Sequence, residues 1–297
     1  MPKLNSNKTV ILVLLIIGTV FIVGSTRALA GGLSIQPIKQ EIQLPPGQSV
    51  PRSLSVFNTS NHPEQVKVFA KTFGVTDENY DYDFGVPPDI STWVQFDKPQ
   101  VTIGPGAQHT FNYALAIPND AEPGGHYLAI FATVTNASQT DSKSTITEQA
   151  GSLIYLTVNG QVSMLGKLLN YGLPKISFNN SLPWDARIQN TGNNHFNSTI
   201  QTDISHWFGR KINSSSETHL ILPGTIRALS GQYKAGHWPD LYKIKVKVSL
   251  GQNPAAQRTI WMLYLPPFYS FMIIVILAVI GLEVSIIIKK RRRKKTT

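Results

Sequence analysis

The sequence predicts an all-β protein: two tandem immunoglobulin-like β-sandwich domains followed by a single transmembrane helix. Short runs of alternating apolar and polar residues fill the chain from Leu33 to Leu265, and turns rich in Gly and Pro separate them, as is typical of sandwiches. The stretch from Phe268 to Ile288 has one charge, Glu283, in 21 positions and spans about 31 Å as a helix, which is one hydrocarbon core. The chain has no cysteine, so both domains must be stable without disulfides.

The C-terminal flank of the apolar stretch predicts its orientation. We expect a transmembrane helix at 266–288 and a basic cytoplasmic tail at 289–297, because cations beside a span stay on the cytoplasmic side. The tail opens with seven consecutive cations: Lys289, Lys290, Arg291, Arg292, Arg293, Lys294 and Lys295. The sequence therefore predicts a single-pass cell-membrane protein with a large extracellular N-terminal part. Tyr264, Phe268 and Tyr269 are expected at the opposite boundary between water and lipid, where aromatic rings are common.

The N-terminus has the three parts of a signal peptide. Lys3 and Lys8 precede the apolar run Thr9–Val23, and Ala28-Leu29-Ala30 offers small residues for cleavage. We interpret residues 1–30 as a signal peptide. An uncleaved first span is the alternative, although the run is short for one. In either case the middle of the chain lies outside.

The net charge of +10 has a local origin. Between residue 31 and the span, 17 Lys and Arg stand against 16 Asp and Glu, so the extracellular part as a whole is almost neutral. The basic excess belongs to the two ends. This distribution argues against nucleic acid as a partner, and it indicates membrane lipid as the partner of the tail.

We expect the first domain at 31–160 and the second at 161–265. Each half offers a strand, an Asn-Thr turn at Asn58 or Asn190, a second strand, and a Pro-Gly turn at Gly106 or Gly224. The order of these features predicts an internal duplication. Cys…Trp…Cys spacing is absent, which disfavours true antibody domains.

A polar loop in the first half holds the candidate ligand-binding residues. Oxygen-bearing side chains and two aromatic rings alternate there: Asp77, Asn79, Tyr80, Asp81, Tyr82 and Asp83. A sugar or a peptide strand could lie on such rings beside amides and carboxylates. An EF-hand is excluded, since its Gly and Glu positions are Tyr82 and Pro88. A less regular calcium site and a simple solvated loop remain the alternatives.

No catalytic or cofactor motif is present in the sequence. The seven histidines are scattered without an HExxH pair, no G-x-S-x-G elbow exists, and no glycine run has the spacing of a phosphate loop. Because no nucleophile and base can be paired, we expect a protein that is not an enzyme, with no cofactor and no metal centre.

The first half resembles the peptidoglycan-binding domain of the WxL-interacting cell-surface proteins of Gram-positive bacteria. The similar features are the turn Leu44–Gln48 before a strand ending at Asn58, the Asp-rich loop before Trp93, the turn Ile103–Gly106, and Ile117-Pro118 followed by Gly124-Gly125-His126-Tyr127. The resemblance covers residues 33–160. It implies a second β-sandwich that binds partner proteins, then a single span and a basic tail.

These observations predict a membrane-anchored surface protein that acts as a binding or scaffold protein. It would engage peptidoglycan, surface proteins, or both through its sandwich domains. The alternative is an assembly chaperone or structural subunit of a surface fibre that uses an exposed edge strand.

Overall fold

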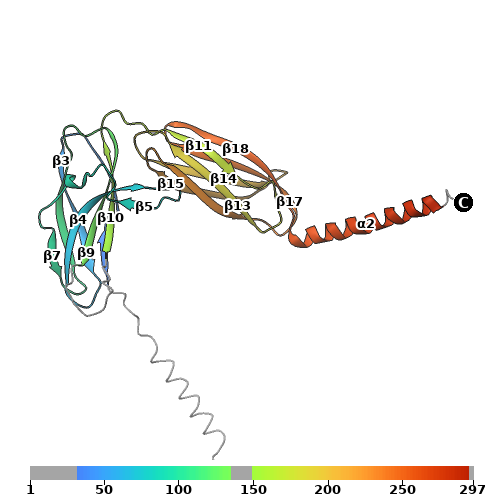
Figure 1. Ribbon diagram of the computed structural model, residues 1–297, viewed down its shortest axis with the longest axis horizontal. Helices are drawn as coiled ribbons and strands as arrows, with labels where there is room; N and C mark the ends of the chain where they lie inside the picture. The colour runs from blue at the N-terminus through green and yellow to red at the C-terminus, as the bar shows by residue number, and fades with distance from the viewer. Residues whose placement is uncertain (1–31, 135–148, 294–297) are drawn as a thin grey trace, which may run out of the picture.

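The computed structural model describes residues 32–134 and 149–293, with side chains placed as far as residue 288. Four β-sheets form two sandwiches, and one long helix follows (Figure 1). The fold class predicted from the sequence is therefore confirmed. The signal peptide predicted at 1–30 and the tail residues Lys294 and Lys295 lie outside the described residues.

The first sandwich packs a four-stranded sheet, in the order β1-β3-β8-β6, on a second sheet, in the order β2-β10-β9-β4-β5, with β7 also paired to β4. A 3₁₀ turn at Ser91–Trp93 precedes β6. The strands are β1 (Leu33–Gln36), β2 (Lys39–Leu44), β3 (Ser49–Asn58), β4 (Glu64–Val75), β5 (Tyr82–Phe84), β6 (Val94–Phe96), β7 (Gln100–Ile103), β8 (Gln108–Ala116), β9 (Gly124–Val134) and β10 (Gln149–Val158).

The second sandwich packs the sheet β11-β13-β16 on the sheet β12-β18-β17-β14-β15. Its strands are β11 (Gly166–Gly172), β12 (Ile176–Ser177), β13 (Ser181–Asn190), β14 (Phe196–His206), β15 (Lys211–Ile221), β16 (Ile226–Lys234), β17 (Asp240–Leu250) and β18 (Asn253–Tyr264). The two domains meet at an angle, and the helix leaves from the far end of the second (Figure 1).

Period-two alternation explains the two cores. Along β13, for example, Leu182, Trp184, Ala186 and Ile188 are buried while the residues between them face outward. Trp184 stacks between the rings of Tyr171 and Tyr233, at centroid distances of 6.1 and 5.8 Å. Each domain thus has its own apolar core, as tandem sandwiches require.

The hydrogen bonds at the ends of β3 and β13 match. Asn58 is 1% exposed, and its side-chain amide donates to the carbonyls of His62 and Ile103 at 2.8 and 3.0 Å. Asn190 is 0% exposed and donates in the same way to the residues at matching positions, Asn194 and Ile221, at 2.8 and 2.9 Å.

The Pro-Gly turns beside these asparagines also match. Gly106 and Gly224 have φ values of 65° and 71°, a left-handed conformation that favours glycine. The two halves therefore repeat one plan at the level of individual contacts.

Helix α2 (Pro267–Arg293) has 27 residues, and its segment Pro267–Ile288 is long and apolar enough to cross a membrane. Tyr264, expected at the lipid boundary, is instead 0% exposed in the core of the second domain. It stacks on Tyr242 and donates to Asn180 Oδ1 at 2.6 Å. The strand β18 runs on to this residue, so its alternating pattern decides where the ring points.

Candidate binding surfaces

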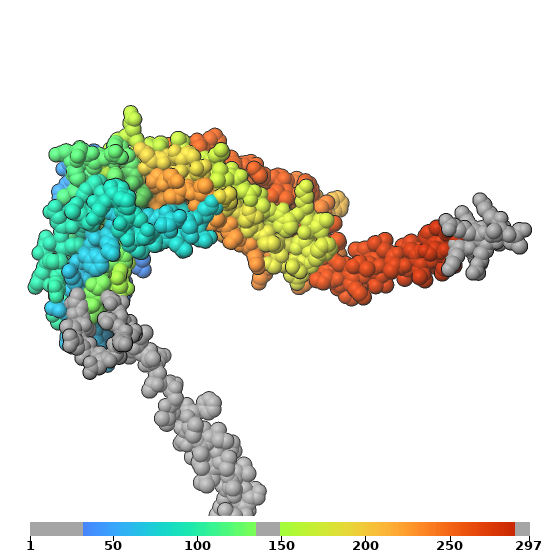
Figure 2. All heavy atoms as spheres, in the orientation of Figure 1, coloured from blue at the N-terminus to red at the C-terminus, as the bar shows by residue number. Residues whose placement is uncertain are grey.

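The loop that holds the predicted ligand residues forms the tip of a hairpin between β4 and β5. Asp77, Asn79, Asp81 and Asp83 are exposed, whereas Tyr80 is 6% exposed. Figure 2 shows this hairpin, in cyan, reaching from the first domain onto the second. The structure therefore separates the six predicted residues: the four polar side chains and Tyr82, which is 42% exposed, lie at the surface, whereas Tyr80 is buried.

Tyr80 is the centre of the contact between the domains. Its hydroxyl accepts a hydrogen bond from the backbone N–H of Leu222 at 2.5 Å and lies 2.7 Å from Thr225 Oγ1. The guanidinium of Arg227 sits over the ring, 4.2 Å from its centroid. Burial raises the pKa of the Tyr80 phenol. Tyr80 also has a φ of 72°, a strained value for a residue with a side chain, which the surrounding contacts must hold.

Glu78 adds a charged and a backbone contact beside Tyr80. Its carboxylate pairs with the guanidinium of Arg187, whose Nε donates to Oε2 at 2.7 Å. Its carbonyl accepts the N–H of Ala228 at 2.7 Å. The hydrogen bonds from Arg187 lower the pKa of Glu78. The hairpin tip thus acts as a brace between the two sandwiches.

A second group of contacts joins the domains near the linker. Asn193 accepts the N–H of Gly125 through its carbonyl at 2.8 Å and donates its amide to the carbonyl of Pro123 at 3.1 Å. His195 Nδ1 lies 3.2 Å from the hydroxyl of Tyr127. Burial lowers the pKa of His195, because the charged imidazolium would lose its hydration there. With the brace, these contacts fix the second domain to the first at two separate places.

The polar side chains of the hairpin turn bond to one another and to the local backbone. The side chain of Asp77 accepts the N–H of Asp81 at 3.1 Å and the amide of Asn79 at 3.4 Å, as in local Asx turns. Among residues 32–134 and 149–288, no group of three or more His, Asp or Glu side chains could hold a metal ion. The ligand-binding role of the exposed residues in this loop stays a prediction.

One sheet edge in the second domain is open where the corresponding edge of the first domain is covered. In the first domain β2 pairs with β10 from Leu153 to Val158. In the second domain β12 pairs with β18 only at Leu263 and Tyr264. Within the described part of the chain, no strand pairs with residues 253–262 on the side away from β17. Such an unpaired edge is a template for a strand from another chain.

The direction of the backbone groups on this edge follows from one hydrogen bond. The N–H of Leu263 donates to the carbonyl of Lys175 at 2.8 Å, away from β17. Because the direction alternates along a strand, Trp261, Thr259 and Gln257 also present their N–H and C=O groups to the open side. A partner strand would form its main-chain hydrogen bonds with these three residues.

The outer face of the same sheet carries a row of cations. Lys243, Lys245 and Lys247 alternate along β17 and stand opposite Trp261, Thr259 and Gln257 of β18. Lys243 Nζ lies 5.4 Å from the ring centroid of Trp261. The carboxylate of Asp203, on the neighbouring strand β14, is paired with Lys211 at 2.7 Å, which lowers its pKa. The face beside the open edge therefore attracts anionic groups.

Charge is divided unevenly between the two domains. Residues 31–160 carry 6 Lys and Arg against 12 Asp and Glu, whereas residues 161–265 carry 11 against 4. The near-neutral total conceals this division. The lysine row is hidden in the overall composition for this reason, although the alternation of Lys243, Lys245 and Lys247 with apolar residues can be seen in the sequence.

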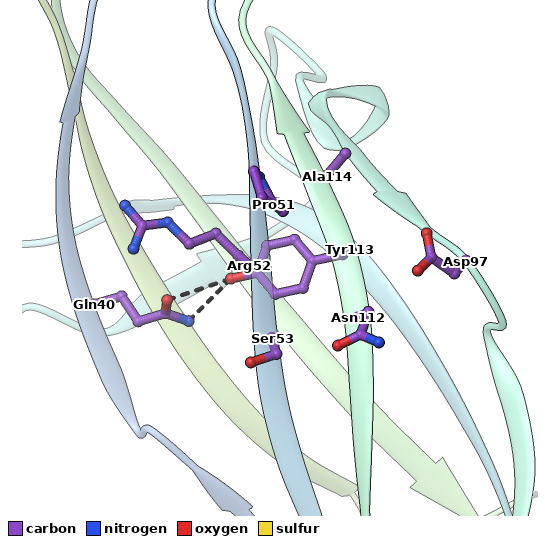
Figure 3. A pocket seen from close by; sticks show the side chains of 8 residues that line it. All are labelled: Gln40, Pro51, Arg52, Ser53, Asp97, Asn112, Tyr113 and Ala114. Carbon is purple, nitrogen blue, oxygen red and sulfur yellow. Dashed lines mark hydrogen bonds between the residues drawn. The ribbon is translucent and has the colours of Figure 1, made fainter.

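The first domain has a polar groove of about 600 Å³, open to solvent (Figure 3). In Figure 3, Gln40 and Arg52 lie on one side of Tyr113, and Asn112 and Asp97 on the other. Gln40 Nε2 donates to the Tyr113 hydroxyl at 3.2 Å, and burial raises the pKa of this phenol. Amide, guanidinium, carboxylate and phenol groups thus line the groove, as in sites for polar ligands.

No known family model and no curated protein sequence matches the chain. Several solved structures show a similar arrangement. The class 5 fimbriae chaperone CfaA has 11% identity, with 79% of this chain and 100% of that chain covered and a TM-score of 0.40. The CupB2 chaperone of Pseudomonas aeruginosa has 10% identity, 77% and 100% coverage and a TM-score of 0.38.

A chain of the CsuC–CsuE chaperone–tip subunit complex of Acinetobacter baumannii has 10% identity, 78% and 99% coverage and a TM-score of 0.39. A similarity at this level does not establish a shared function. The two-domain sandwich assignment rests on the strand order of this chain itself.

Proposed function

We propose that the protein is a membrane-anchored cell-surface binding protein whose second domain holds a strand of a partner protein along the open edge of β18. The observation that carries this proposal is the difference between the two domains: β2 covers β10, but β12 covers only the end of β18, and no described strand covers residues 253–262 on the side away from β17. Main-chain hydrogen bonds to Gln257, Thr259 and Trp261 supply affinity in this mode of recognition.

The lysine row indicates the chemistry of the partner strand. A strand added to the open side of β18 would lie two strand spacings, about 10 Å, from β17. Lys245 and Lys247 could reach over the outer face of β18 toward it, so acidic side chains on that face of the added strand would be favoured. Helix α2 anchors the domain, and the basic tail after it keeps the domains extracellular. The same open edge also supports the alternative function, a chaperone or fibre subunit that receives a donor strand.

A proline substitution tests the proposal on the full-length chain in its own membrane. Thr259→Pro removes one N–H from the open side without removing a bond to β17. Thr259→Ala is the matched control, since it keeps that N–H and loses only the side chain. A photo-crosslinker placed at Gln257 should give a protein adduct that Thr259→Pro abolishes and Thr259→Ala retains. Equal adducts in both variants would contradict strand addition.

The polar groove of the first domain supports a second candidate function, the binding of peptidoglycan that the WxL-interacting resemblance implies. Arg52 and Asp97 there offer groups for the amides, hydroxyls and carboxylates of that polymer. Co-sedimentation of the full-length protein in detergent with purified peptidoglycan tests it. Arg52→Ala should weaken the binding, whereas Arg258→Ala, in the second domain, should not. If Arg52→Ala bound peptidoglycan as well as the wild type, this groove would not be the binding site.

A further inference from the structure

The second domain presents exposed aromatic side chains at the end from which the helix leaves. Trp207 and Phe208, in the turn between β14 and β15, are 64% and 60% exposed. Trp238, in the loop before β17, is 71% exposed, and Phe178, just after β12, is 53% exposed. Exposed rings of this size are uncommon on a soluble surface and indicate a contact with an apolar phase.

Strand register places these rings at one end of the sandwich. His206 pairs with Tyr242, and Asp240 pairs with Tyr264, so the β14–β15 turn and the loop before β17 both lie where β18 ends. β12 pairs with the same last residues of β18. The ring of Trp238 is 5.7 Å from that of Tyr269, in the first turn of α2. The aromatic end and the start of the helix are therefore one continuous surface.

The connection between the domain and the helix is too short to let them separate. Tyr264 ends β18 and Pro267 begins α2, a distance of about 10 Å even if the chain were fully extended. The N–H of Leu265 also donates to the carbonyl of Ser177 at 2.9 Å, and Ser270 Oγ donates to the carbonyl of Leu265 at 3.1 Å. If α2 crosses a membrane, this end of the domain must lie at the lipid headgroups.

The turn that carries Trp207 and Phe208 is held rigidly. His206 accepts the N–H of Gly209 and donates its own N–H to the carbonyl of Arg210, both at 2.9 Å. The His206 ring stacks on Phe208 at 4.9 Å and pairs with Asp240. Rings presented on a fixed turn enter the headgroup region at little cost in conformational entropy.

We infer that this aromatic end, Phe178, Trp207, Phe208 and Trp238, inserts into the lipid headgroup region and seats the second domain on the bilayer. Trp is the residue most suited to that boundary, because its ring is apolar and its indole N–H can bond to headgroups. The bilayer, and not a partner protein, is the occupant, because the short connection already holds these rings at its surface. The inference rests on the proposed membrane anchor and adds a second contact to it.

Brominated lipids test the inference in the full-length protein. α2 contains no Trp, so all Trp fluorescence comes from the two domains. The protein is reconstituted in vesicles of phosphatidylcholine and phosphatidylglycerol, with and without bromine on the acyl chains. The double variant Trp207→Ser/Trp238→Ser should reduce the lipid-dependent quenching at least about twofold. Trp93→Phe, in the first domain, is the matched control and should leave the quenching unchanged.

Flotation of the same vesicles separates the two proposals. Protein that floats but shows no quenching dependent on Trp207 and Trp238 overturns the seating and leaves the anchor intact. Protein that does not float overturns both. Crosslinked dimers lost in the double variant, with quenching unchanged, would overturn the lipid contact and assign the aromatic end to a second copy of the chain.

Discussion

The hydroxyl of Tyr80 in the first domain accepts the backbone N–H of Leu222 in the second, at 2.5 Å, across 142 residues of sequence. Leu222 is 2% exposed, so this N–H has no access to solvent while the domains are docked. The side chain of Tyr80 therefore satisfies a buried main-chain donor of the second domain. Hydrogen exchange of the Leu222 amide should therefore report on the docking of the two domains.

Removing this hydroxyl should weaken the docking of the two domains. Tyr80→Phe leaves the Leu222 N–H buried and unpaired, at a cost of about 1–3 kcal/mol. Hydrogen exchange of the Leu222 amide should accelerate by about ten- to a hundredfold, since about 1.4 kcal/mol corresponds to tenfold. Tyr82→Phe is the control, because Tyr82 is 42% exposed and its hydroxyl bonds to the Tyr155 hydroxyl within the first domain. Unchanged exchange in Tyr80→Phe would contradict the bracing role.

The docking should also weaken below neutral pH through His195. Its pKa is lowered in the folded protein by burial, so protonation favours the undocked or unfolded state. The stabilisation is complete above about pH 6.5, the ordinary value for histidine, and declines as the pH falls toward the lowered pKa. Thermal melting at pH 7.5 and pH 5.5 measures this loss.

Charged neighbours of His195 modify this effect without reversing it. Glu41 raises the pKa and Lys39 lowers it, while Tyr127 and Tyr155 face the ring. His195→Gln should remove the pH dependence between 7.5 and 5.5. If that variant kept the full dependence, another group would be responsible.

Glu78 should act in a separate, more acidic range. Arg187 lowers its pKa, so its contribution is present above about pH 4.5 and is lost as the pH falls through the lowered value. Glu78→Gln should therefore accelerate Leu222 exchange at pH 6, and the difference from the wild type should disappear as the pH falls through the lowered pKa of Glu78. The reversed pair Glu78→Arg/Arg187→Glu should recover part of the slow Leu222 exchange at pH 6. If exchange in this double variant were as fast as in Glu78→Gln, the ion pair would not contribute to the docking.

The fold was predictable because its signals are local. Alternation identifies strands, Pro-Gly pairs identify turns, and a long apolar run with a single charge identifies α2. The same alternation places the ring of Tyr264 in the core, but only because β18 extends as far as this residue. The prediction that Tyr264 lies at the lipid boundary was wrong, because it rested only on the short distance in sequence between Tyr264 and the span.

The interaction surfaces were less predictable because they join residues that are far apart in sequence. Tyr80 is an aromatic residue in a polar loop, and nothing near it shows that Thr225 and Arg227 will enclose it. The open edge of β18 depends on the length of β12, which is only two residues. Pairing partners and loop contacts of this kind follow from the tertiary arrangement, and one sequence does not encode them in a local pattern.

The repeated asparagines should be equally important for their own domains. Asn58→Ala and Asn190→Ala each leave buried backbone carbonyls without a donor, which should lower the free energy of unfolding by about 3 kcal/mol. Thermal unfolding of the full-length protein measures the loss. Asn61→Ala, an exposed neighbour in the same turn, should change it by less than about 0.5 kcal/mol. A large effect in only one domain would show that the two turns are not equivalent.

The lysine row should make partner binding dependent on salt. If an acidic strand lies along the open side of β18, Lys245→Glu/Lys247→Glu places like charges on the same sheet face, one strand further in, and should reduce the adduct formed from Gln257 by about tenfold at low salt. In the wild type the adduct should weaken as salt rises from about 0.05 to 0.5 M, because the exposed charges become screened over a few ångströms. Lys98→Glu, on the first domain, is the matched charge control. A salt response that persists unchanged in the double variant would separate the lysine row from partner binding and leave only the backbone edge as the recognition element.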